Sequence, residues 1–315
     1  MAAYQQPPPP SGGPQPQTPQ RSYTCPWCGT VSQGVTLSCP ACGAPVDVKL
    51  IVSKSGWYES PGIRDMAKLQ FGSSHCQIEG TYVPVADMNL ATSDSVYFTH
   101  HVLLWKDPSV AISTMPLKGG WKRMFAGLPL IMTQAHGPGH IAFSQDKPGE
   151  MVALPLQPGQ AIDVREHAFM VATSAVQYDW FQTGIYFTTK SGDDTETHYP
   201  MGTFMDRFLA PQAPGLLLLH GGGNVFVRRL GQGETILIKP TSLLYKDTSV
   251  QMNLHMERSS GYQGGFWGGW SSWNHRHIWL RLFGPGRVAI ESAFAPMEDN
   301  GSNITSSSPL STQNW

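Results

Sequence analysis

The sequence predicts an all-β fold built from three related β-units. Between residues 137 and 176, two runs alternate apolar and polar side chains, His140–Phe143 and Ile162–Val171, and Pro-Gly turns separate them. Alternation of period two between Gly- and Pro-containing turns is typical of half-buried β-strands. The 33 glycines and 26 prolines of the 315-residue chain also favour many turns over long helices.

The second observation is recurrence along the chain. Residues 103–110 recur 140 positions later as residues 243–250, with six of the eight positions identical. A middle copy lies 66 positions after the first, and the Gly-Pro-Gly turn at 137–139 recurs at 284–286. We therefore expect units near 47–114, 130–189 and 216–256, with a closing hairpin after the third. Units of this size indicate one duplicated domain rather than a solenoid.

Composition narrows the classes of function. Only 14% of residues are charged and the net charge is −1, which gives no electrostatic basis for binding nucleic acid. No apolar run approaches the roughly 18 residues that span a bilayer, and no secretory signal is visible. Four of the five cysteines are in paired spacing, which indicates metal binding in a reducing compartment, so we expect a cytoplasmic protein.

The two ends of the chain have the composition of disordered segments. Residues 1–22 are rich in Pro and Gln with few large apolar side chains, and residues 297–315 are mostly polar. Such segments bury too little surface to offset the entropy of ordering, so we expect both to be disordered. Docking of the Pro-rich leader on an aromatic groove of a partner is the alternative.

Residues 23–46 predict a zinc ribbon. Two Cys-Pro-x-Cys-Gly knuckles are separated by ten residues, and each places two thiolates on one tight turn. Four thiolates in a tetrahedron suit one structural Zn²⁺ per chain; iron and a redox Cys-x-x-Cys are the alternatives. A site with four protein ligands is closed to catalysis, so we expect the ribbon to bind a protein partner. The predicted ligands are Cys25, Cys28, Cys39 and Cys42.

The repeated units resemble a known family. The Gly-Gly-Trp-Lys-Arg segment at 119–123 and the His-Gly-Gly-Gly-Asn segment at 220–224 are similar to the family named for altered inheritance of mitochondria, member twenty-four. The resemblance covers residues 47–296. It implies a β-sandwich of the double-stranded β-helix type, like the tryptophan RNA-binding attenuation protein (TRAP-like), which often self-associates. Mitochondrial members are similar to organisers of inner-membrane architecture, and no catalytic residues are implied.

Two alternative functions rest on the β domain. His275 and His277 lie on one face of an expected strand, where they could contribute to a cupin-like metal-dependent enzyme. No acidic ligand stands at a recognisable spacing, and alternate residues of any strand share a face. The other alternative is a small-molecule site in the mouth of the sandwich.

A glycine-rich aromatic segment at 261–270 favours an interaction protein. Aromatic side chains on glycine spacers are typically buried at a subunit interface, inserted at a membrane surface, or folded back onto their own domain. We therefore expect a non-catalytic scaffold or regulatory protein that forms homo-oligomers, a trimer among them, with peripheral membrane contact left open. The residues concerned are Phe266, Trp267, Trp270 and, just beyond the segment, Trp273.

Overall fold

The protein is almost entirely β-structure in the computed structural model. The structure describes residues 22–25, 30–33, 38–44, 55–59, 67–116, 131–191, 193–258, 276–295 and 304–307. Within these ranges the helical elements are two short 3₁₀ turns, η1 (His100–Val102) and η2 (Pro240–Ser242). The predicted all-β sandwich is confirmed.

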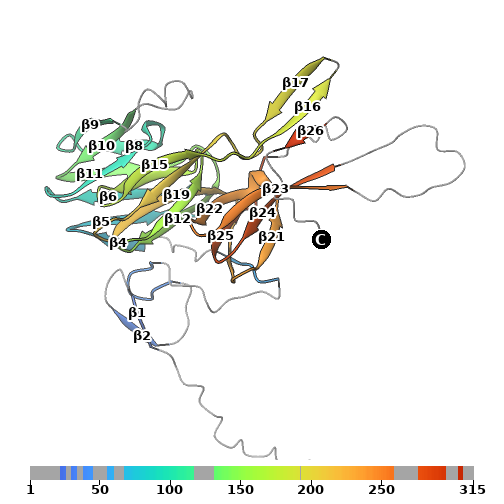
Figure 1. Cartoon of the computed structure of the whole chain (residues 1–315). Helices are drawn as coiled ribbons and strands as arrows, with labels where there is room; N and C mark the ends of the chain where they lie inside the picture. Colours follow the sequence, from blue (N-terminus) through green and yellow to red (C-terminus); the bar gives the residue numbers. More distant parts are fainter. Residues whose placement is uncertain are drawn as a thin grey trace, which may run out of the picture.

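Three units of six strands each form the body, and they follow one another across Figure 1 from cyan to orange. The first unit contains β6 (Val85–Leu90), β7 (Ser95–Phe98), β8 (Leu103–Lys106), β9 (Ala111–Pro116), β10 (Ile131–His136) and β11 (Gly139–Phe143). The second contains β12 (Gly149–Leu156), β13 (Ala161–Arg165), β14 (Phe169–Thr173), β15 (Gln177–Gln182), β18 (Phe204–Leu209) and β19 (Gly215–Gly222). The third contains β20 (Val225–Leu230), β21 (Thr235–Ile238), β22 (Leu243–Asp247), β23 (Gln251–Arg258), β24 (Arg276–Phe283) and β25 (Gly286–Glu291).

All three units share one antiparallel pairing plan. The sixth strand pairs with the first and the third, and the fifth pairs with the second and the fourth. In the first unit these pairs are β11 with β6 and β8, and β10 with β7 and β9. The second and third units repeat the plan strand for strand. The recurrence seen in the sequence is therefore a recurrence of topology.

Neighbouring units are joined by shared sheets. The third strand of each later unit pairs with the second strand of the unit before it, β14 with β7 and β22 with β13. These pairings create a six-stranded sheet, β12-β19-β14-β7-β10-β9, and a seven-stranded sheet, β15-β18-β13-β22-β25-β20-β3. The outer layers are a five-stranded sheet, β4-β5-β6-β11-β8, and a three-stranded sheet, β21-β24-β23.

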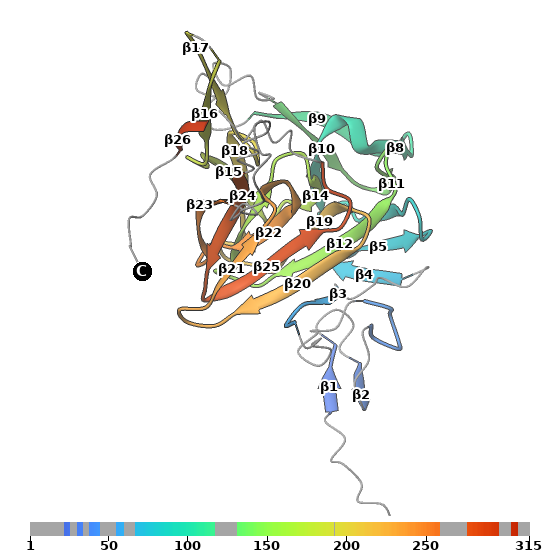
Figure 2. The ribbon, with the colours of Figure 1, turned by 90° about the vertical axis from the view of Figure 1, so that its right-hand side faces the viewer.

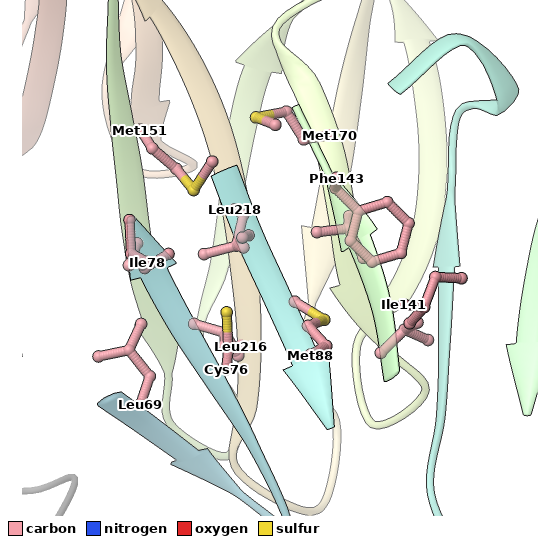
Figure 3. Close-up of a cluster of buried hydrophobic side chains, with 14 of the residues drawn as sticks. Leu69, Cys76, Ile78, Met88, Ile141, Phe143, Met151, Met170, Leu216 and Leu218 are labelled. Atoms are coloured by element: carbon pink, nitrogen blue, oxygen red, sulfur yellow. The ribbon is translucent and has the colours of Figure 1, made fainter. Parts of the chain in front are cut away.

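Three apolar clusters fill the spaces between successive sheets. Side chains of the five-stranded sheet, such as Ile78 and Phe143, face Met151, Met170 and Leu218 of the six-stranded sheet (Figure 3). Strand β14 is buried at every position, because it has one sheet on each face. An inner strand of this kind reads as a continuous apolar run rather than as an alternating one.

Shorter strands extend this body. The strands β4 (Ala67–Phe71) and β5 (Ser74–Glu79) widen the five-stranded sheet beside β6, and β3 (Tyr58–Glu59) lies beside β20. A separate sheet joins β16 (Phe187–Ser191), β17 (Asp194–His198) and β26 (Ile304–Ser307). The last of these lies inside the 297–315 segment. At the N-terminal end β1 (Ser22–Thr24) pairs with β2 (Val31–Gln33).

The unit boundaries differ from those expected from the sequence. The closing hairpin at 276–291 completes the third unit, because β24 and β25 return to pair with its earlier strands. Residues 204–209 lie beyond the expected end of the second unit at 189, and they form its fifth strand. The Gly221–Gly223 segment is a crossover between sheets, since β19 pairs with β12 and β14 and β20 pairs with β25. A Cβ at Gly221 would lie 2.3 Å from Val225 Cγ2, so this crossover requires glycine.

Candidate metal centre

Three of the four predicted metal ligands meet at one point. The sulfur atoms of Cys25, Cys39 and Cys42 all lie within 4.8 Å of one another, and the Cys25 and Cys42 Sγ atoms are 3.7 Å apart. Sulfurs bound tetrahedrally to zinc at about 2.3 Å lie roughly 3.8 Å from each other, so this spacing fits a metal site. A disulfide would require about 2.0 Å. Cys28 lies outside the described residues.

Local backbone hydrogen bonds shape the two knuckles. Cys25 follows β1, and its N–H donates to the Thr30 carbonyl at 3.0 Å, which closes the first turn. In the second turn the Cys39 N–H donates to the Ala44 carbonyl at 2.8 Å, and the Gly43 N–H donates to the Cys39 carbonyl. Gly43 has φ of +76°, a left-handed conformation that favours glycine. The Cys-Pro-Ala-Cys-Gly sequence at 39–43 therefore supplies the turn that brings the thiols of Cys39 and Cys42 together.

The second knuckle packs directly on the β body. The backbone N–H of Lys68 in β4 donates to the Cys42 carbonyl at 2.9 Å. Cys25 and Cys39 are buried in the same apolar cluster as Leu69, which faces the six-stranded sheet. The metal centre is thus an extension of the core between two sheets. A hollow of about 410 Å³ lies at this junction, lined by Cys42, Lys68, Leu69, Gln70, Ser73, Ser74 and His75.

The fifth cysteine has no part in this centre. Cys76 is fully buried in β5 among apolar side chains, and burial raises the pKa of its thiol. A neutral buried thiol in an alternating strand behaves as a small apolar side chain.

The other predicted site residues are only partly described. His277 lies on β24 opposite Glu257, with its ring 6.4 Å from that of Trp279. His275 lies outside the described residues, as do all four aromatic residues of the glycine-rich segment, Phe266, Trp267, Trp270 and Trp273. Across the residues that the structure describes, the cysteine group is the only cluster of three or more potential metal ligands.

Sequence reasoning missed an ionic cluster inside the body. A lysine at the end of a strand is usually solvated, but Lys246 is only 4% exposed. Its Nζ donates to Asp163 Oδ2 at 2.7 Å, while Arg207 donates from Nε to Oδ1 at 2.7 Å. The hydrogen bond to Asp163 raises the pKa of Arg207. The sequence signal was the repeated Lys-Asp pair, but the partner of Lys246 lies 83 positions away.

The neighbouring Asp247 is paired as well. It accepts hydrogen bonds from the backbone N–H of Arg287 at 2.7 Å and from the guanidinium of Arg287. In the first unit the equivalent Asp107 accepts the backbone N–H of His140 at 2.8 Å. These carboxylates anchor the turn after each Gly-Pro-Gly segment, and the pairing is structural.

Comparison with known proteins identifies the family. Residues 76–293 match the family described as "Mitochondrial biogenesis AIM24". The chain belongs to the AIM24 family. This confirms the resemblance drawn from the glycine segments, and the matched residues span all three β-units.

The chain is also similar to a solved structure, the crystal structure of protein SPYM3_0169 from Streptococcus pyogenes. The two are 19% identical with a TM-score of 0.49, over 70% of this chain and 94% of that one. Comparison with curated proteins gives no match. Among the residues that the structure describes, no helix is long and apolar enough to cross a bilayer.

Proposed function

We propose that this AIM24 protein is a non-catalytic scaffold that self-associates through its β body and binds a protein partner through a zinc ribbon. The observation that supports this most strongly is the cluster of three cysteine thiols. Three thiols already converge within 4.8 Å, and Cys28 of the first knuckle would supply a fourth. Four protein sulfurs leave no open position for a substrate or water, which is the arrangement of structural zinc.

The bound metal is proposed to be one Zn²⁺ per chain. Zinc prefers four thiolates in a tetrahedron, and a folded knuckle of this size depends on its metal. When bound, the ion would hold the two turns together, and the Lys68 to Cys42 hydrogen bond would hold the ribbon against β4. The ribbon would then present a fixed surface to a partner rather than act as a flexible appendage.

The ionised side chains inside the body support the non-catalytic assignment. The Asp163 carboxylate is held by Lys246 and Arg207, and Glu291 accepts hydrogen bonds from Arg165 and from the Gly222 N–H. Groups saturated by fixed partners stabilise the fold and are poorly placed to exchange protons with a substrate. The family description adds a link to mitochondrial biogenesis, and the role proposed here is one of assembly in that process. A cytoplasmic location is our proposal from the paired metal-ligand spacing of the cysteines, and cell fractionation would test it.

Elemental analysis combined with copurification tests this function. The full-length protein should contain one zinc per chain, and the Cys39→Ser variant should lose it. A partner copurified from the native cell extract should be lost with Cys39→Ser and retained with Cys76→Ala, which removes a thiol outside the centre. A second metal bound by the Cys39→Ser protein would favour the cupin-like enzyme that uses His275 and His277 instead. Partner binding unchanged in Cys39→Ser would contradict the role of the ribbon.

A further inference from the structure

Two edge strands at opposite ends of the body, β8 and β21, correspond to the strands that pair with each other where neighbouring units meet. Within the described residues, β8 pairs only with β11 and β21 pairs only with β24. The strand β8 is the third of its unit and β21 is the second of its unit. Inside the chain, third and second strands of adjacent units pair with each other, as β14 does with β7 and β22 with β13. Figures 1 and 2 both place β8 and β21 on opposite sides of the body.

The two internal junctions have the same register. In the first, Ala172 faces Tyr97, and in the second, Lys246 faces Asp163. Ala172 and Lys246 stand 66 and 140 positions after Lys106, so they are its equivalents in the repeat. On the other side of the junction, Asp163 of the second unit corresponds to Tyr97 of the first. The corresponding residue of the third unit is Leu237, which stands 140 positions after Tyr97. A third junction of the same kind would therefore place Lys106 opposite Leu237.

The side chains on these edges have the apolar character of a buried junction. Leu104 and Trp105 of β8 are 57% and 43% exposed, while the equivalent Leu244 and Tyr245 of β22 are buried. Leu237 of β21 is 37% exposed, although its equivalents at the internal junctions are fully buried. Edge strands of soluble proteins are usually protected by charges, prolines or bulges, and an exposed apolar edge is a template for another strand.

We propose that β8 of one copy of this chain pairs antiparallel with β21 of a second copy, in the register that sets Lys106 opposite Leu237. This inference rests on the proposed self-association and names the strands that carry it. A second copy is the occupant because the chain itself presents both halves of the junction, and it forms that junction twice internally with one register. Trp105 would then lie opposite Ile238 and become buried, as the equivalent Tyr245 is.

The contact joins different surfaces of the two copies, so the assembly is head-to-tail. Such heterologous contacts close into a ring when the rotation from copy to copy permits, and otherwise continue as a filament. Main-chain hydrogen bonds between the two edges would supply affinity, and the apolar side chains would supply register, as in other strand additions.

Substitutions that change the charges at Lys106 and Leu237 provide the test. Leu237→Lys sets a lysine opposite Lys106 and buries two like charges, so the apparent dissociation constant for self-association should rise at least about tenfold. Leu237→Asp should retain association, because it reproduces the facing Lys246–Asp163 pair of the internal junction. The double variant Lys106→Glu with Leu237→Lys should restore association. Ile112→Lys is the matched control, since Ile112 is 41% exposed on the edge strand β9 that joins no units.

Sedimentation velocity on the full-length proteins over a range of concentrations measures the outcome, with circular dichroism to verify folding. Loss of association in Leu237→Lys, rescue in the double variant and no effect of Ile112→Lys would support the junction. A wild-type oligomer that Leu237→Lys leaves unchanged would overturn this inference but not the self-association itself. A wild-type protein that is monomeric throughout would contradict both. Loss without rescue in the double variant would contradict the facing register.

Discussion

Lys246 donates a hydrogen bond to Asp163 across the junction of two units, with Nζ 2.7 Å from Oδ2. The two residues face each other in β22 and β13, and both are almost fully buried. Arg207 completes the cluster from β18 on the other side of β13. One carboxylate thus pairs with two cations where the second and third units meet, and this arrangement makes the junction sensitive to a single substitution.

Replacing Asp163 should destabilise the body. Asp163→Asn removes the negative charge and leaves Lys246 buried without a counter-charge, which typically costs about 3–5 kcal/mol. Lys246→Met should cost less, because Asp163 keeps its paired hydrogen bonds from Arg207. Urea denaturation measures both free energies of unfolding. Glu196→Gln is the control, since the exposed Glu196 lies 3.7 Å from His198 at the surface and should change stability by less than about 0.5 kcal/mol. Equal losses for the Asp163 and Lys246 variants would contradict this account of the cluster.

Removing the metal should loosen the ribbon while the body stays folded. Cys39→Ser should abolish binding of the proposed zinc ion and uncover Leu69, with a loss of about 1 kcal/mol in the free energy of unfolding that lowers the thermal midpoint by roughly 2–4 °C. Differential scanning calorimetry measures the midpoint, and far-ultraviolet circular dichroism should retain the β signal. Cys76→Ala should keep the zinc. Global unfolding of Cys39→Ser would show that the β body depends on the metal, contrary to this expectation.

Stability should fall in mild acid. Burial lowers the pKa of His220 below the ordinary value of 6.5, although the contact of its Nε2 with the Lys147 carbonyl at 3.1 Å works in the opposite direction. Burial also lowers the pKa of His101 and of His255. Because the unfolded chain then binds protons more readily than the folded one, stability is complete above about pH 6.5 and is lost as the pH falls through that value.

The change for one such histidine is at most about 1.4 kcal/mol per pH unit. Urea denaturation at several values between pH 8 and pH 5 measures the slope. His220→Gln keeps a donor for the Lys147 carbonyl and should reduce the slope of stability against pH. His136→Gln is the control, because it changes an exposed histidine that contacts Ser113. A slope that is the same in His220→Gln as in the wild type would rule out this residue as a source.

Deleting residues 261–270 should lower the order of the oligomer and leave the domain folded. The deletion spares β23 and β24, which pair with each other over eight residues on either side of it. Light scattering gives the mass, and circular dichroism gives the fold. An unchanged mass would refute an interface role for Phe266, Trp267 and Trp270, and these aromatic residues would then pack elsewhere.

Local patterns in the sequence predicted much of this protein. The spacing of the cysteines predicted the cluster of Cys25, Cys39 and Cys42, because a knuckle forms within a few residues. Period-two alternation predicted the strands, and the recurrence predicted the repeated units, because both patterns can be read directly along the sequence. Family membership was visible in the glycine segments. The two Gly-Pro-Gly turns at 137–139 and 284–286 mark the same position in two units.

What the sequence did not predict depends on long-range pairing. The pairing of β14 with β7 and of β22 with β13 is invisible to periodicity, since each strand could pair within its own unit. The same limitation hid Lys246, because a lysine at a strand end is usually solvated and its partner Asp163 belongs to another unit. The contact between Lys68 and Cys42 was also missed, for it joins the ribbon to a strand that carries no metal-binding signal.

The mass of the full-length wild-type protein in solution, measured by sedimentation velocity at rising concentration, tests the central claim most directly. A self-associating scaffold predicts species heavier than one chain, with a distribution that shifts upward as concentration increases. A single species with the mass of one chain across the whole concentration range would contradict the claim.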